Sequence, residues 1–143
     1  MSGSILLVDD SQAMLEMLDR SLASEGYHVA TAASGEEAVS RLAEEEFDVV
    51  VTDLVMPGLG GLDVLERARL LGLRTAVILM TAHASLNTAI AALRAGACDY
   101  LEKPFALADL TMLVRRLTEH RAARLSDRPN RRPIAEVVRH GHW

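Results

Sequence analysis

The sequence predicts a single α/β domain in which a doubly wound, five-stranded parallel sheet is covered by helices on both faces. The first observation is that five short apolar runs alternate with five stretches of helical hydrophobic spacing. That alternation is typical of strand–helix–strand units joined by right-handed crossovers. The second is that three of the runs are almost entirely apolar, as strands buried on both faces are. A chain of 143 residues, 50% of them hydrophobic, is long enough to bury such a sheet.

The five strand candidates differ in how continuously apolar they are. The first, third and fourth are nearly all apolar, so we expect them in the centre of the sheet. The second and fifth mix polar and apolar residues, which is typical of strands at the edges. The candidates are Ile5–Val8, His28–Thr31, Phe47–Val51, Thr75–Met80 and Asp99–Leu101.

The stretches between and after these runs predict five amphipathic helices. Their apolar residues recur three or four positions apart, and Gly26, Gly72 and Gly96 provide stops for the first, third and fourth. Ser34 and Glu37 have the capping-box spacing that predicts the start of the second helix. The apolar positions of the other four are Met14, Leu15, Leu18 and Leu22; Leu62, Leu65 and Ala68; Leu86, Ile90 and Leu93; and Leu107, Leu110, Leu113, Val114 and Leu117.

Composition narrows the class of protein. The single cysteine, Cys98, allows no internal disulfide, and no secretory signal is recognisable. No apolar run approaches the about 18 residues of a membrane span, so we expect a cytoplasmic domain without membrane contact. Residues 1–120 hold 9 basic and 18 acidic residues, which argues against direct binding of nucleic acid. We interpret residues 4–121 as the domain and residues 122–143 as a basic tail or linker.

Chemically active side chains follow four of the predicted strands. Asp9 and Asp10 follow the first, and Asp53 follows the third. Thr81 follows the fourth strand and Lys103 the fifth. The carboxyl ends of parallel strands meet at one edge of the sheet, where doubly wound folds bind their ligands. We therefore expect three carboxylates, one hydroxyl and one ammonium group to converge there.

These groups suit phosphoryl transfer. Three neighbouring carboxylates repel one another unless a cation lies between them, and a hard divalent ion such as Mg²⁺ or Mn²⁺ prefers oxygen ligands. An ionised carboxylate is already a nucleophile and can form an acyl phosphate. The transfer then needs its phosphoryl oxygens neutralised, which the metal, Lys103 and Thr81 could do.

The same residues lie in motifs that resemble the receiver domain of two-component response regulators. The resemblance covers about residues 4–121 in the family's order, and the conjunction is more specific than any single motif. It implies a flavodoxin-like sheet with the strand order 2-1-3-4-5. The motifs are Val8–Asp10, Asp53–Pro57 with Gly61, Thr81–His83 and Asp99–Phe105.

The resemblance also implies a phosphorylation site and its metal. It makes Asp53 the residue that accepts the phosphoryl group. Asp9 and Asp10 become the acidic pair that holds Mg²⁺, directly or through water, together with Asp53. The backbone carbonyl of Val55 would complete the metal site.

Further implied roles concern switching and partners. Thr81 and Lys103 would contact the phosphoryl group, and the ring of Tyr100 would change rotamer as Thr81 moves. The Lys103–Pro104 peptide would be cis. The donor would be a sensor histidine kinase or a phosphotransfer protein. The altered surface, formed by the fourth helix, fifth strand and fifth helix, would meet a downstream effector or a second copy of the chain.

Structural interpretations stand beside these roles. Asp9 and Asp10 could cap the first helix, and Thr81 could simply end a strand. Tyr100 could be an ordinary packing residue. His83 could tune hydrolysis of the acyl phosphate or only face solvent.

Other functions also stay open. A phosphohydrolase of the haloacid-dehalogenase type would need a second aspartate two residues after Asp53, where Val55 stands. A pseudo-receiver that only binds protein would not need the intact set of site residues. The sequence contains no Walker loop and no recognisable helix-turn-helix, so it is either a stand-alone receiver or a fragment of a longer regulator.

Overall fold

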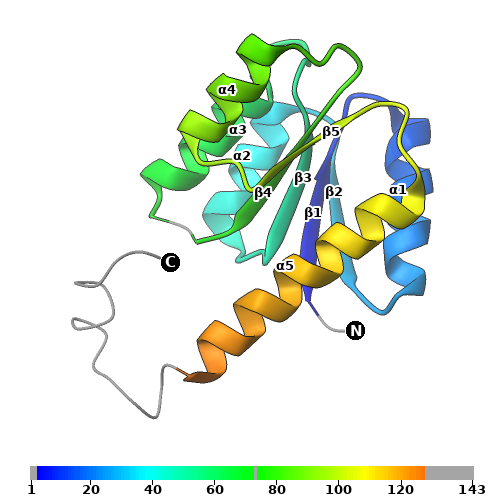
Figure 1. Cartoon of the computed structure of the whole chain (residues 1–143), viewed down its shortest axis with the longest axis vertical. Helices are drawn as coiled ribbons and strands as arrows, with labels where there is room; N and C mark the ends of the chain where they lie inside the picture. The colour runs from blue at the N-terminus through cyan, green and yellow to red at the C-terminus, as the bar shows by residue number, and fades with distance from the viewer. Residues whose placement is uncertain (1–2, 73, 128–143) are drawn as a thin grey trace.

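The computed structural model describes residues 3–72 and 74–127, which form five strands alternating with five helices (Figure 1). The alternation predicted from the apolar runs is confirmed. The strands are β1 (Ser4–Val8), β2 (His28–Ala32), β3 (Val49–Asp53), β4 (Ala76–Thr81) and β5 (Asp99–Glu102). The helices are α1 (Gln12–Ser24), α2 (Gly35–Glu44), α3 (Gly61–Leu70), α4 (Leu86–Ala95) and α5 (Leu107–Asp127).

The five strands form one parallel sheet in the order β2-β1-β3-β4-β5, as expected. The strand order reverses between β1 and β3, which places the switch point of the topology at their carboxyl ends. Val8 lies opposite Thr52, and Asp53 lies opposite Met80. The three central strands therefore end at the same edge of the sheet.

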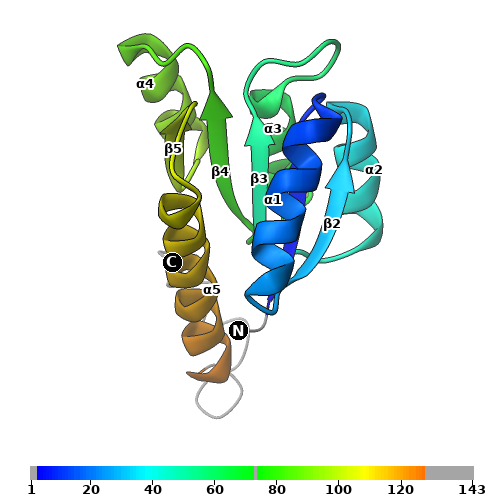
Figure 2. The same cartoon turned by 90° about the vertical axis from the view of Figure 1, so that its right-hand side faces the viewer.

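Helices cover both faces of the sheet. Figures 1 and 2 show α2, α3 and α4 on one face and α1 and α5 on the other. Successive residues of a strand point to opposite faces, so each central strand contributes to two cores. Leu6 and Val8 pack with the α2–α4 layer, whereas Ile5 and Leu7 pack with the α1–α5 layer. Burial on both faces explains why the central strands are continuously apolar.

Serines begin three of the helices. Ser11 accepts a hydrogen bond from the Met14 amide at the start of α1. Ser34 accepts one from the Glu37 amide at the start of α2, which confirms the predicted cap. Ser85 begins α4 in the same way. Each cap satisfies an amide that has no partner within its helix.

The α4 helix is held to the sheet by few apolar contacts. Ala92 is its only buried residue, whereas α3 buries Gly61, Val64, Leu65 and Ala68. Leu86 and Leu93 of α4 are 76% and 65% exposed. The apolar spacing correctly predicted this helix, but its leucine side chains are largely exposed.

The last helix extends past the predicted domain end. Helix α5 continues to Asp127, so residues 122–127 of the predicted tail are helical. The remainder of that segment lies outside the described residues. Among the described residues, no helix is both long and apolar enough to cross a membrane.

Candidate functional site

The carboxyl ends of the strands bring the predicted side chains together. Asp9 directly follows β1, Asp53 ends β3, Thr81 ends β4 and Lys103 directly follows β5. Asp9, Asp10 and Asp53 each offer a carboxylate oxygen within 4.8 Å of the others. The expectation that these sequence-distant groups share one edge of the sheet is confirmed.

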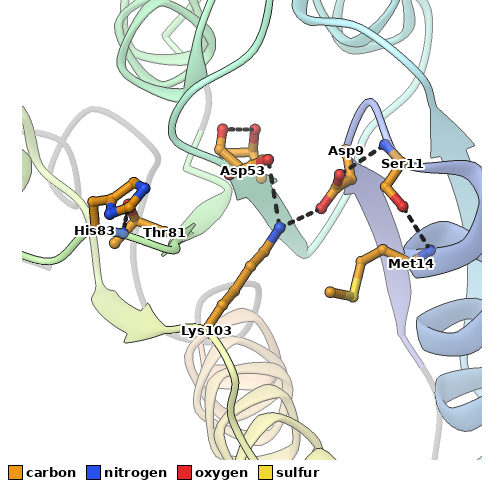
Figure 3. Close-up of polar contacts among 8 residues, drawn as sticks. Asp9, Ser11, Met14, Asp53, Thr81, His83 and Lys103 are labelled. Carbon is orange, nitrogen blue, oxygen red and sulfur yellow. Dashed lines mark hydrogen bonds and ion pairs between the residues drawn. The ribbon is translucent and has the colours of Figure 1, made fainter.

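Lys103 joins two of the carboxylates (Figure 3). Its Nζ lies 2.9 Å from Oδ2 of Asp9 and 3.4 Å from Oδ2 of Asp53. The Asp9 side chain is 1% exposed and the Lys103 side chain 18%, so water screens these pairs poorly. The second oxygen of Asp9 accepts a hydrogen bond from the Ser11 amide at 2.9 Å. Asp9 is thereby fixed between the lysine and the start of α1.

Burial and charge perturb the acid–base behaviour of Asp53 and Lys103. Burial raises the pKa of Asp53 above its ordinary value, and the negative charge of Asp9 raises it further. Lys103 and the Val55 amide lower it, but only in part. Burial by itself would lower the pKa of Lys103. The hydrogen bonds and negative charges of Asp9 and Asp53 outweigh the effect of burial, so the pKa of Lys103 is raised. One ammonium thus compensates the cluster incompletely.

The donor set fits a hard divalent cation. All three candidate ligands offer carboxylate oxygens, and Asp10 is exposed, so the group is open to solvent on one side. Mg²⁺ prefers one or two carboxylates and keeps several waters, which such an open cluster allows. A divalent ion at this position would favour the ionised form of Asp53, against the burial and the charge of Asp9 that raise its pKa.

The backbone after Asp53 is fixed against α2, a feature that the sequence analysis missed. The Val55 amide donates to the Asp53 carboxylate, while its side chain is 71% exposed. The Leu59 amide donates to Oε2 of Glu36 at 3.3 Å. A Cβ at Gly35 would collide with the Leu59 carbonyl oxygen, so only glycine permits this close approach. The Val55 carbonyl as a metal ligand stays a prediction.

The β4–α4 loop carries a hydroxyl at each end. Thr81 is 1% exposed, and its Oγ1 accepts a hydrogen bond from the His83 amide at 3.1 Å (Figure 3). His83 thus contacts Thr81 through its backbone, whatever its imidazole does. At the other end, Thr88 Oγ1 lies 2.7 Å from the Tyr100 phenol oxygen. The sequence analysis did not single out Thr88, although Ser85 and Thr88 have capping-box spacing with threonine at the third position.

The Lys103–Pro104 peptide is cis, as expected. The backbone amide of Lys103 donates to the Thr81 carbonyl at 2.7 Å. The backbones that carry Thr81 and Lys103 are therefore tied together at the edge of the sheet.

Comparison with known proteins agrees with this fold and site. The sequence model of the response regulator receiver domain matches residues 5–115. The match covers well over half of the chain, and the chain belongs to the receiver domain family of two-component response regulators.

Particular relatives support the assignment. Response regulator MprA of Mycobacterium tuberculosis is 44% identical over 117 residues, which cover 82% of this chain and 51% of MprA. The chain thus spans about half the length of the curated relatives that it matches. The CheY-like receiver domain of Methanospirillum hungatei superposes with a TM-score of 0.80 at 32% identity, covering 86% of this chain and 99% of that one. Chemotaxis protein CheY4 of Vibrio cholerae gives 0.77 at 29%, covering 82% and 99%.

Proposed function

We propose that this receiver domain accepts a phosphoryl group on Asp53 from a sensor histidine kinase or a phosphotransfer protein, with Mg²⁺ or Mn²⁺ as cofactor. The observation that carries the proposal is the position of Lys103. Its ammonium group contacts Asp9 and Asp53 together, beside a third carboxylate from Asp10. A structural ion pair needs one carboxylate, whereas two on the lysine with a third beside them provide for an additional cation.

The transfer exchanges one bond for another. A carboxylate oxygen of Asp53 attacks the phosphorus of a phosphohistidine donor and forms a new oxygen–phosphorus bond. The phosphorus–nitrogen bond breaks, and the imidazole leaves with the electron pair. Lys103 faces the Asp53 oxygen and neutralises charge on the transferred group, and the Thr81 hydroxyl donates to one of its oxygens. No general base is required, because the carboxylate attacks in its ionised form.

The metal would be held by Asp9, Asp10 and Asp53, with the backbone carbonyl of Val55. When bound, it would supply positive charge to the nucleophile and to the phosphoryl oxygens. Asp9 is already oriented for this role by the Ser11 amide.

Phosphorylation would then change the surface of α4, β5 and α5. The acyl phosphate would carry about −1.5 to −2 charges in place of one, and would draw Thr81 toward it. Tyr100 would change rotamer as the β4–α4 loop follows. The changed surface would bind a downstream effector protein or domain, or a second copy of the chain. The domain would promote only its own phosphorylation and dephosphorylation, and would act in the cytoplasm.

Labelling with a small phosphoryl donor tests the proposal. The protein is incubated with acetyl phosphate and Mg²⁺, and its intact mass is measured. We expect one added phosphoryl group, which is absent from Asp53→Asn and in the presence of a chelator. Asp109→Asn is a matched control, because Asp109 is an exposed carboxylate of α5. Labelling of Asp53→Asn, or continuous turnover of an external phosphate ester, would contradict the proposal.

Dimerisation has its own measurement. Sedimentation of the protein with and without phosphoryl donor should differ if phosphorylation drives pairing through α4, β5 and α5. Equal sedimentation at the concentrations used for labelling would exclude that part of the proposal.

A further inference from the structure

The phenol of Tyr100 is hydrogen-bonded to a helix that the phosphoryl chemistry does not use. Its oxygen lies 2.7 Å from Oγ1 of Thr88, which joins β5 to the first turn of α4. Tyr100 is partly buried and packs against the core on the α2–α4 side of the sheet. Its ring is therefore held at both ends, by apolar packing at the body and by a hydroxyl at the tip.

The Thr88 hydroxyl also contacts the backbone and the hydroxyl of Ser85. A hydroxyl donates once and accepts twice. Thr88 Oγ1 donates to the Ser85 carbonyl at 3.0 Å and accepts from the Ser85 amide at 3.2 Å. The same oxygen lies 3.0 Å from the Ser85 hydroxyl and 2.7 Å from the Tyr100 phenol, and in each of these two pairs either oxygen can be the donor.

The same hydroxyl stabilises the beginning of α4. Ser85 and Thr88 form a reciprocal capping box, in which the Thr88 amide donates to Ser85 Oγ at 3.1 Å. Departure of Tyr100 would remove one of the hydrogen bonds of the Thr88 hydroxyl, which also holds the Ser85 backbone. The orientation of Tyr100 and the order of the first turn of α4 are thus coupled through one oxygen.

This network lies close to Thr81 along the chain. Three residues, 82–84, separate Thr81 from the Ser85 cap, and Thr81 Oγ1 accepts from the His83 amide at 3.1 Å. Movement of Thr81 toward a phosphoryl group would pull this short segment. The pull reaches the Ser85 cap and the first turn of α4, which contains Thr88, before the rest of the helix.

We propose that Thr88 is a positioning residue that holds Tyr100 in its resting orientation and so opposes the phosphorylated state. The inference rests on the proposed function, because it concerns how that site is regulated. It adds a specific restraint: the resting form is favoured by the Tyr100–Thr88 hydrogen bond, which must break before the ring can move.

Removal of either partner should favour the phosphoryl-bound state. A hydrogen bond of this kind changes a two-state equilibrium about two- to tenfold. Thr88→Val keeps the shape of the side chain but removes the hydroxyl, and Tyr100→Phe removes the phenol oxygen without touching the α4 cap. Both should bind beryllofluoride, a mimic of the phosphoryl group, with a half-saturating concentration about two- to tenfold lower in the presence of Mg²⁺.

Two further variants separate the restraint from general loosening of α4. Thr88→Ser retains the hydroxyl and should bind as the unchanged protein does. The double variant Thr88→Val with Tyr100→Phe should gain no more than Thr88→Val alone, because that substitution has already removed the Tyr100–Thr88 bond. Unchanged or weaker binding by Thr88→Val and Tyr100→Phe, or fully additive gains in the double variant, would overturn the proposal.

A fluorine measurement tests the restraint without any phosphoryl chemistry. The chain has two tyrosines, so uniform 3-fluorotyrosine labelling gives two signals. Tyr27 is the internal reference, since its phenol lies 3.4 Å from Thr118 in the other core. Thr88→Val should shift the Tyr100 signal and leave that of Tyr27 in place, whereas an unmoved Tyr100 signal overturns the restraint. A protein that binds no beryllofluoride yet shows this shift would contradict the proposed function and retain the restraint.

Discussion

Replacement of Lys103 by methionine tests how strongly the carboxylate cluster depends on its one ammonium group. Methionine keeps an unbranched, flexible side chain but leaves Asp9 and Asp53 without the cation that lies 2.9 Å and 3.4 Å from them. Removing one partner from a buried ion pair destabilises a protein by about 3–5 kcal/mol. We expect about 3 kcal/mol here, at the lower end, because Asp53 is 9% exposed and can take up a proton.

The measurement is urea unfolding at pH 7 in the presence of a chelator, followed by helical circular dichroism. The midpoint should fall while the dependence of the free energy on urea stays the same. The deficit should also shrink as the pH is lowered, because protonation removes the uncompensated negative charge.

A second ion pair provides the control for this experiment. Arg115 Nη2 also lies 2.9 Å from a carboxylate oxygen, that of Glu25, but these side chains are 48% and 36% exposed. Arg115→Met should therefore lose no more than about 1 kcal/mol. Equal losses in the two variants would refute the reasoning, since burial is what distinguishes the pairs.

Three other predictions follow from the site and the loop beside it. Asp53→Asn should raise the free energy of unfolding in chelator at neutral pH. The pKa of Asp53 is raised in the folded state, so the ionised carboxylate destabilises the fold. The stability gained by Asp53→Asn should therefore vanish as the pH falls toward 3.8, the ordinary pKa of the group. Urea titrations at several pH values measure this. Mg²⁺ at 100 times its dissociation constant should stabilise the protein by about 2.7 kcal/mol. The same Mg²⁺ concentration should stabilise the Asp10→Asn variant less, and thermal unfolding measures both effects. Gly35→Ala should destabilise the protein by about 1–3 kcal/mol, because the added Cβ would clash with Leu59. Gly72→Ala is the control and should destabilise less, since Gly72 has a positive φ but nothing lies within 4 Å of the added Cβ. Similar urea midpoints for the two variants would contradict this prediction.

Much of the fold could be predicted because it depends on burial, which leaves a periodic pattern. Leu6 and Leu7 face opposite cores, so a strand that contributes to both must be apolar throughout. The convergence of Asp9, Asp53 and Lys103 could be predicted for a related reason. Once the strands are parallel, their carboxyl ends meet at one edge whatever the loops do.

Contacts made by loops could not be predicted in this way. The bond between Glu36 and Leu59 joins the first turn of α2 to the β3–α3 loop, and the Thr88–Tyr100 bond joins the start of α4 to β5. Neither leaves any repeat in the sequence, because each depends on the distance between elements and not on the spacing within one. The reach of α5 to Asp127 was missed because charged residues beyond Leu117 obscure its apolar spacing.

The shallow attachment of α4 has a consequence for how the molecule loses structure. A helix that contributes only Ala92 to the buried core can separate from the sheet at the cost of few apolar contacts. Its amides should therefore exchange with solvent deuterium through local opening, well before those of β1 and β3, which require global unfolding. A binding partner that covers Leu86 and Leu93 would slow that exchange, and the slowing would map its footprint on this face.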